Sequence, residues 1–250
     1  AEGLALAAWI GATFAVAGFV KGVVGMGLPT VAMGVLSVVM APAVAAAMLV
    51  VPSLVTNVWQ LVAGPAFGAI SRRLATMMIA AFVGTLLGIG VITGASAGLA
   101  GAARGGVLAL YGVIGLAAPR FAVSRRAERW LSPVVGLVTG LVTGATGVFV
   151  VPAVPYLNSL GLAKDELIQA LGLSFTVSTV ALAVALATRG QFQTNVAWTS
   201  ALAVLPALGG MFVGQRVRDR MDPVAFRRWF FVGLLVLGLY MMTRALWRTA

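Results

Sequence analysis

The chain of 250 residues is 61% hydrophobic and 9% charged, whereas a soluble domain is about 45–50% apolar and about 25% charged. It carries 17 Lys and Arg against 6 Asp and Glu, for a net charge of +11, and it contains no His and no Cys. This composition excludes a soluble fold, disulfides, and most zinc and haem sites. We expect a single all-α integral membrane domain over residues 1–250, with no cofactor and no metal.

The positive charge is explained by membrane topology rather than by nucleic acid. Lys and Arg gather in the cytoplasmic loops of inner-membrane proteins and set their orientation. The same residues attract anionic lipid headgroups. Membrane lipid is therefore an expected partner and nucleic acid is not. The first residues lack a basic region, so a cleavable signal peptide is not expected.

Long apolar stretches divide the chain into two similar halves, each with a glycine-broken leading segment followed by three helices. A span needs about 20 apolar residues. In repeat 1, residues 4–119, we predict the broken segment over 4–40 and helices near 43–64, 72–93 and 97–119. A basic connector is expected over 120–129. In repeat 2, residues 130–247, we predict the broken segment over 131–160 and helices near 166–188, 194–215 and 224–247.

Glycine spacing supports the repeat. Corresponding positions in the two halves are Gly18, Gly22, Gly25 and Pro29 with Gly140, Gly144, Gly147 and Pro152, then Gly84 and Gly88 with Gly210 and Gly214. Glycines four residues apart form a small-xxx-small pattern that lets two helices approach closely. Agreement in order, spacing and helix count therefore predicts two related structural units.

The distribution of charge predicts that each broken segment is a hairpin that returns to its own side. With hairpins, each half crosses the membrane an odd number of times, so the two repeats are inverted. Twelve of the 17 basic residues then share one side: Arg72, Arg73, Arg120, Arg125, Arg126, Arg129, Lys164, Arg216, Arg218, Arg220, Arg227 and Arg228. The other side holds Arg189, Arg244 and Arg248. This asymmetry fits the positive-inside rule and a bacterial-type inner membrane.

The paired breaks are the expected substrate site. Broken helices in equivalent places of two halves mark the binding site of many transporters. A helix that restarts after a break offers free N–H groups and the positive end of its dipole, which suits an anion. The expected site residues in the breaks are Gly22, Gly25, Gly27, Thr30, Thr143, Gly144, Thr146 and Gly147. The alternative is that these glycines serve only close helix packing.

Lys21 is the most distinctive candidate, because a cation inside an apolar stretch is costly and usually functional. It could also extend to the membrane interface. Snorkelling or a place in a loop is expected for Arg104, which stands near the start of its helix. Polar residues that could line a cavity are Ser53, Thr56, Asn57 and Gln60, and in the second half Ser174, Thr176, Ser178 and Thr179; of these we include Asn57 and Ser174 in the site.

The acidic residues argue against other chemistries. All six lie at chain ends or in connectors: Glu2, Glu128, Asp165, Glu166, Asp219 and Asp222. Carriers of cations or protons normally keep a carboxylate within the membrane. An intramembrane hydrolase would lack a histidine base. An inside-negative potential also drives anions outward. We therefore expect an anion exporter and no enzyme.

The segment from Gly18 to Gly27, followed by Pro29, resembles the opening motif of the TauE/SafE family of sulfite exporters and organosulfonate permeases. The glycines at 140, 144 and 147 with Pro152 resemble that family's repeat of the motif. The resemblance covers essentially the whole chain and implies transport of sulfite, of sulfonates such as sulfoacetate, or of related organic anions. At the second break, Val148 and Phe149 stand where small residues are expected.

Together these observations predict a secondary transporter that exports a small anion by alternating access around the two breaks. A passive anion or small-solute channel and a non-transporting membrane scaffold are the alternatives. Self-association into a homo-oligomer is compatible with each of them.

Overall fold

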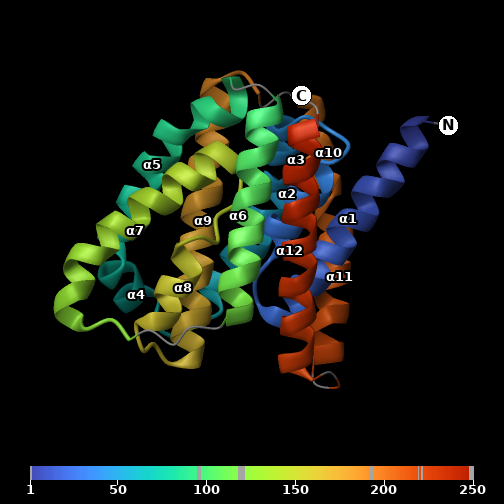
Figure 1. Ribbon diagram of the computed structural model, residues 1–250. Helices are drawn as coiled ribbons and strands as arrows, with labels where there is room; N and C mark the ends of the chain where they lie inside the picture. The colour runs from blue at the N-terminus through green and yellow to red at the C-terminus, as the bar shows by residue number, and fades with distance from the viewer. Residues whose placement is uncertain are drawn as a thin grey trace.

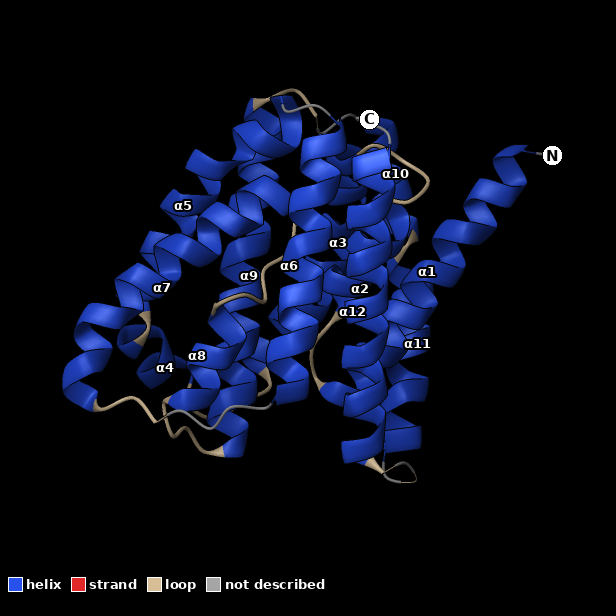
Figure 2. Ribbon diagram, viewed as in Figure 1, coloured by secondary structure: helices blue, strands red, loops and turns tan. Residues whose placement is uncertain are grey.

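The computed structural model describes residues 2–94, 97–117, 122–191, 194–218, 220 and 222–247. These residues form helices joined by short connections, with no strand among them (Figure 2). Within this part of the chain, seven helices are long and apolar enough to cross a membrane. The prediction of an all-α, multi-pass membrane protein is confirmed.

Among the described residues, each half of the chain contains six helices. In the first half these are α1 (Glu2–Val24), α2 (Leu28–Leu36), α3 (Pro42–Val62), α4 (Phe67–Arg73), α5 (Ala75–Gly94) and α6 (Ala97–Ala117). In the second half they are α7 (Arg125–Thr146), α8 (Ala153–Ser159), α9 (Lys164–Thr188), α10 (Thr194–Leu202), α11 (Val204–Arg218) and α12 (Pro223–Trp247). The leading segments are α1–α2 and α7–α8, as two broken segments require.

The boundary between the halves differs from the prediction. The basic connector was expected to reach residue 129, but α7 already begins at Arg125. Ser124 caps this helix, since its hydroxyl accepts a hydrogen bond from the Ala127 N–H at 3.3 Å. Serine at this position satisfies a free N–H of the first turn. Arg120, Asp219 and Arg248 lie outside the described residues.

The two leading segments break at left-handed glycines. Gly25 has φ +83° and ends α1, and Gly147 has φ +73° and ends α7. In both cases the glycine N–H bonds to the carbonyl four residues earlier, of Lys21 and of Thr143, at 2.7 Å. Gly27, with φ +107°, precedes α2. Left-handed backbone is favourable only for glycine, which explains the residue at these points.

Gly22 and Gly144 were expected to interrupt their helices, and this is wrong, because both lie inside them. They serve close packing instead. A Cβ at Gly22 would lie 2.3 Å from the Met211 carbonyl oxygen on α11. A Cβ at Gly144 would lie 2.3 Å from the Thr85 carbonyl oxygen on α5. Any side chain at either position would separate the helices.

The glycine pairs of each half pack against the glycine-containing helices of the other half. In α1 and α11, a Cβ at Gly18 would lie 2.0 Å from the Ala207 oxygen, and one at Gly210 would lie 2.0 Å from the Ala15 oxygen. Helices α5 and α7 pack in the same way through Gly84, Gly88, Gly140 and Gly144. The first arm of each half therefore packs on the α5 or α11 helix of the other half.

The remaining long helices pair with their counterparts. Helix α3 packs on α9, and α6 packs on α12. The two halves are thus interleaved along their whole length rather than set side by side (Figure 1). This reciprocal arrangement is what two structurally related repeats produce.

The basic connections gather at one end of the bundle. The links from α4 to α5 and from α8 to α9, the end of α11, and the starts of α7 and α12 lie at the lower end in Figure 1. The start of α1 and the ends of α9 and α12 lie at the upper end. Each leading segment returns to the end from which it started, as a hairpin does (Figure 1). The inverted relation of the repeats is consistent with this course and stays a prediction.

Two adjacent glycines of α11 test the packing. We expect Gly210→Ala to lower stability by about 1–3 kcal/mol, the usual cost of overpacking, because its Cβ would enter the space of the Ala15 carbonyl. Gly209 has no atom within 4 Å of an added Cβ, so Gly209→Ala should be neutral or slightly stabilising. The measurement is the apparent melting temperature of the purified protein in detergent. Equal melting temperatures for the two variants would contradict this account.

Candidate functional site

Lys21 is buried where three helices meet. Its side chain is 4% exposed, three residues before the end of α1. The ammonium donates a hydrogen bond to the Oδ1 atom of Asn57 on α3. The Asn57 amide in turn donates to the hydroxyl of Thr179 on α9, at 3.4 Å. A polar chain therefore runs from the first break to the central pair α3–α9, and the Lys21 ammonium is bonded inside the protein.

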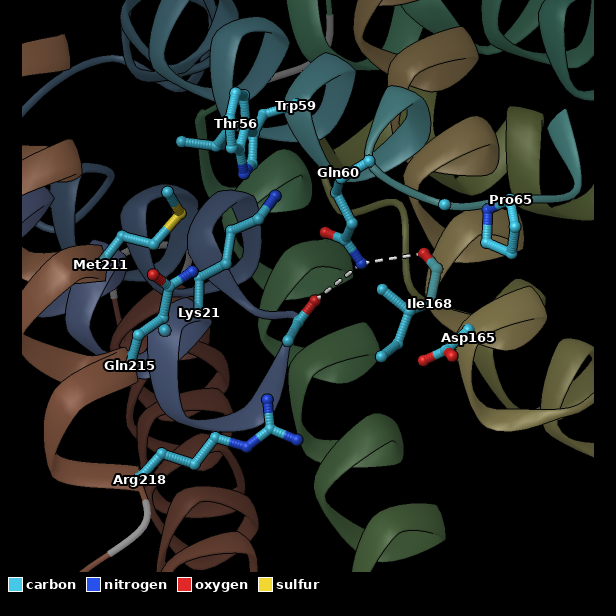
Figure 3. Close-up of a pocket in the computed structure, with 14 residues that line it drawn as sticks. Lys21, Thr56, Trp59, Gln60, Pro65, Asp165, Ile168, Met211, Gln215 and Arg218 are labelled. Atoms are coloured by element: carbon cyan, nitrogen blue, oxygen red, sulfur yellow. Dashed lines mark hydrogen bonds between the residues drawn. The ribbon is translucent and has the colours of Figure 1, made fainter.

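A cavity of about 380 Å³ leads to Lys21 (Figure 3). We call it the inner cavity. It is lined by Lys21, Gly22, Gly25, Thr56, Trp59, Gln60, Ala63, Gly64, Pro65, Asp165, Ile168, Met211, Gln215 and Arg218. The ends of α3 and α11 and the start of α9 form its wall, so it lies toward the basic end of the bundle (Figure 1).

Gln60 holds the first break against α9. Its amide donates to the Gly25 carbonyl at 3.1 Å and to the Ile168 carbonyl at 3.0 Å (Figure 3). The Gly25 carbonyl, at the C-terminal end of α1, would otherwise be short of a donor. The cavity wall carries two cations, Lys21 and Arg218, and one carboxylate, Asp165. Its charge therefore favours an anion.

The expected residues of the second break form a separate group. Thr143 and Thr146 are buried in the last turn of α7. Their hydroxyls donate to the carbonyls of Thr139 and Val142, each at 2.7 Å. Both hydroxyl protons are thus used within their own helix. Neither threonine lines the inner cavity.

The two broken segments do touch. A Cβ at Gly147, in the second break, would lie 2.9 Å from the sulfur of Met33 on α2, the second arm of the first segment. Thr30 on α2 is fully buried, and its hydroxyl has no partner. Ser174 on α9 is also buried. The structure thus places Lys21, Gly22 and Gly25 at the inner cavity, with Asn57 beside them, and the other expected residues elsewhere in the interior.

Arg104 was expected to snorkel or to lie in a loop, and this is wrong. It lies within α6 and is 1% exposed. Its Nε donates to the carbonyl of Thr146 at 3.2 Å, at the end of α7. A cation is favourable at the C-terminal end of a helix dipole. An arginine within an apolar stretch could have indicated this burial, but the sequence does not show its partner, because Thr146 lies 42 residues away.

Arg104 also borders a second cavity, of about 360 Å³. We call it the outer cavity, because its lining residues lie toward the end opposite the basic connections (Figure 1). It is lined by residues 37–42, Gly101, Arg104, Tyr240, Met241, Arg244 and Ala245. Each break thus has a buried cation beside it and a cavity next to that cation.

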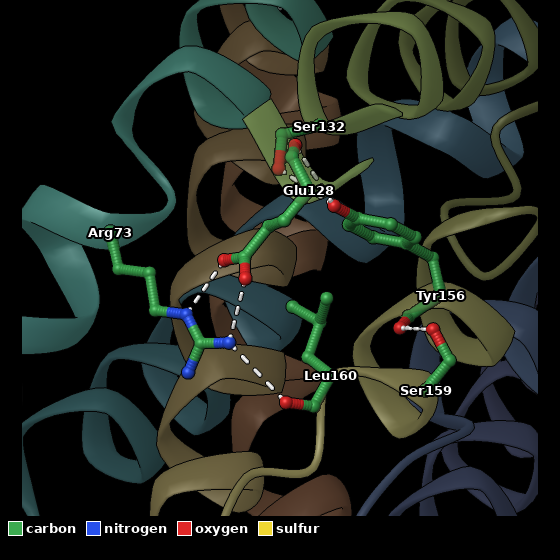
Figure 4. A network of polar contacts seen from close by, with 6 residues as sticks. All are labelled: Arg73, Glu128, Ser132, Tyr156, Ser159 and Leu160. Atoms are coloured by element: carbon green, nitrogen blue, oxygen red, sulfur yellow. Dashed lines mark hydrogen bonds and ion pairs between the residues drawn. The ribbon is translucent and has the colours of Figure 1, made fainter. Parts of the chain in front are cut away.

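A polar network outside the cavities joins the halves at the basic end (Figure 4). Arg73 of α4 donates to both carboxylate oxygens of Glu128 on α7, at 2.6 and 2.8 Å, and to the Leu160 carbonyl at 3.3 Å. The hydrogen bond to Glu128 raises the pKa of Arg73 above its usual value. Ser132 and Tyr156 share a bond of 2.8 Å beside it. The bidentate pair of Arg73 and Glu128 fixes α4 against the start of α7.

Two helix breaks within a membrane-spanning bundle are a common arrangement in membrane transporters. The chain matches the family described as Sulfite exporter TauE/SafE over residues 10–241, nearly its whole length. It belongs to the TauE/SafE family. Neither a curated protein nor a solved structure matches it.

Membership confirms three expectations. The resemblance to the family is confirmed over residues 10–241, and the protein is a membrane transporter rather than an enzyme. The family is one of sulfite and related anion exporters. Trp59, Asp165, Gln215 and Arg218 were not expected at a site, because only the tertiary packing of α3, α9 and α11 brings them to Lys21.

The absence of cysteine from the sequence makes single-cysteine labelling a clean test of the two cavities. We expect Gln215→Cys in the inner cavity to react with a membrane-impermeant thiol reagent in inside-out vesicles only. Ser37→Cys in the outer cavity should react in right-side-out vesicles only. The cysteine-free parent is the control. Labelling of both positions from one side would contradict the assignment of the cavities to opposite ends.

Proposed function

We propose that this protein exports sulfite or an organosulfonate by alternating access, with Lys21 as the first contact of the anion. The observation that carries the proposal is a buried ammonium that lines a cavity and is bonded to a neutral partner. Lys21 bonds to Asn57, and the one ion pair among the described residues joins Arg73 and Glu128. A buried charge without a counter-charge is costly, and a bound anion would supply one.

The shape of the inner cavity supports entry from the basic end. By the positive-inside rule this end is cytoplasmic, and the membrane is of the bacterial inner type in our proposal. An anion from the cytoplasm would pass Arg218 and Gln215 before reaching Lys21 and the first break. The glycines there keep the backbone bare, so a small oxyanion could approach it closely.

Energetics favour outward movement. An inside-negative potential drives each negative charge out by about 2.3 kcal/mol per 100 mV. Export of sulfite or a sulfonate then requires no coupling ion. The acidic residues of the described helices lie in their first turns, with Glu2 in α1, Glu128 in α7, and Asp165 and Glu166 in α9. A proton-relay carboxylate in the middle of a span is therefore not expected.

The interleaved halves favour an alternating-access mechanism rather than a channel of fixed structure. We propose that the paired arms α1–α11 and α5–α7 move as units against the central helices, since their glycine contacts hold each pair together. The proposed site includes Lys21, Asn57, Gly22 and Gly25. Thr30, Thr143, Thr146 and Ser174 do not line the inner cavity, and we propose that the anion meets them in another state of the cycle.

The two lysines of the chain provide a matched test. Lys21 is buried, whereas Lys164 is exposed at the start of α9. We expect Lys21→Met to weaken the apparent affinity for the anion about 10–150-fold, because a hydrogen bond to a charged group contributes about 1.5–3 kcal/mol. Lys164→Met should leave it unchanged. The measurement is efflux of labelled sulfite and sulfoacetate from proteoliposomes with an inside-negative potential.

The same assay separates the alternatives. Counterflow of labelled anion against excess unlabelled anion is expected of a transporter, and a channel would show none. Equal efflux by the Lys21→Met and Lys164→Met variants would contradict the proposed site. Absence of flux for both anions in correctly reconstituted protein would remove the proposed substrates.

A further inference from the structure

Arg104 has hydrogen-bonding capacity that the protein does not use. Its Nε bonds to the Thr146 carbonyl, but its Nη2 atom is buried without any partner. A buried guanidinium N–H group without an acceptor is destabilising, and such groups are rare in native proteins. The position therefore calls for an acceptor that the chain does not supply.

Capping of α7 does not account for this residue. One bond to the Thr146 carbonyl satisfies the end of the helix, and a shorter donor could provide it, as Gln60 does for the Gly25 carbonyl. A guanidinium adds a fixed fork of donors whose geometry fits two oxygens of one oxyanion. The unused Nη2 belongs to that fork.

The charged side chains that line the outer cavity, among the described residues, are all positive. Arg244 also lines it, held by a bond of 3.0 Å from its Nη1 atom to the Val38 carbonyl. The N-terminal end of the 21-residue helix α3, at Ala41 and Pro42, forms another part of the wall. A helix N-terminus carries partial positive charge. No carboxylate occurs among the described residues that line this cavity.

We propose that Arg104 is a second anion-binding station, at the outer end of the pathway, that takes the sulfite or sulfonate headgroup after it leaves Lys21. This inference rests on the proposed function. Two oxygens of the headgroup would accept bonds from the guanidinium, with Nη2 as one donor. Arg244 and the start of α3 would attract the anion from the same cavity.

The location of Arg104 couples this station to the second break. Its Nε is bonded to Thr146, the residue before the left-handed Gly147. A change of backbone at Gly147 would move the bonded carbonyl and turn the guanidinium with it. Lys21 stands four residues before Gly25, in the first break. One cation therefore serves each break, and the two face cavities at opposite ends.

The test uses protection of a single cysteine in each cavity by sulfoacetate, a sulfonate that does not consume thiol reagents. Ser37→Cys reports the outer cavity and Gln215→Cys the inner one. In protein that keeps Arg104, we expect sulfoacetate to slow labelling of each probe from its own side. Adding Arg104→Gln should raise the concentration for half-protection of the outer probe about tenfold or more, and leave the inner probe unchanged.

Two further variants act as controls. Arg104→Lys keeps a cation near the Thr146 carbonyl but lacks the fork of donors. We expect it to raise the concentration for half-protection of the outer probe less than Arg104→Gln does. Arg189→Gln removes an exposed arginine directly after α9, whose end lies at the same end of the bundle (Figure 1), and should shift neither probe. A structural role alone would alter both probes together through a change in folding or packing.

The outcomes separate the inference from the proposed function. Protection of the inner probe without any protection of the outer probe, in protein that keeps Arg104, overturns the second station and leaves the exporter proposal intact. A shift of both probes together in the Arg104→Gln variant, or a shift of neither, also overturns the second station. Absence of protection at both probes in the parent removes sulfonate as the substrate, and the inference falls with it.

Discussion

The hydrocarbon interior of a membrane contains no water to satisfy a broken helix, and the protein meets this constraint with two side chains from distant helices. Gln60 donates to the carbonyl of Gly25, and Arg104 donates to the carbonyl of Thr146. Without such donors, the ends of α1 and α7 would carry unpaired carbonyls at substantial cost. The breaks, and the cavities beside them, depend on these bonds.

The glycine contacts determine how the two halves fit together. Gly18 and Gly22 face Gly210 and Gly214, while Gly84 and Gly88 face Gly140 and Gly144. Between apolar helices in lipid there is little hydrophobic gain from association, so close backbone contact has to supply the attraction. The first arm of each leading segment is thereby packed against the opposite half.

The distribution of charge links this architecture to anion transport. One buried cation lies beside each break, and neither is paired with a carboxylate among the described residues, since the ion pair there is that of Arg73 and Glu128. That pair lies at the basic end and joins the halves outside both cavities (Figure 4). The Arg73–Glu128 charges are thus neutralised by bidentate pairing, whereas the cations beside the cavities bond to neutral groups.

The sequence by itself determined the class of fold and the glycine-broken segment that leads each half, and it predicted a site at Lys21. These follow from local properties: apolar length, the left-handed conformation of Gly25 and Gly147, and the cost of a cation in lipid. Only the tertiary structure decided that Gly22 and Gly144 pack helices, that Arg104 is buried against Thr146, and that Gln215 and Arg218 line the cavity next to Lys21. Those features depend on contacts between helices far apart in the chain, and no local pattern specifies which helices meet.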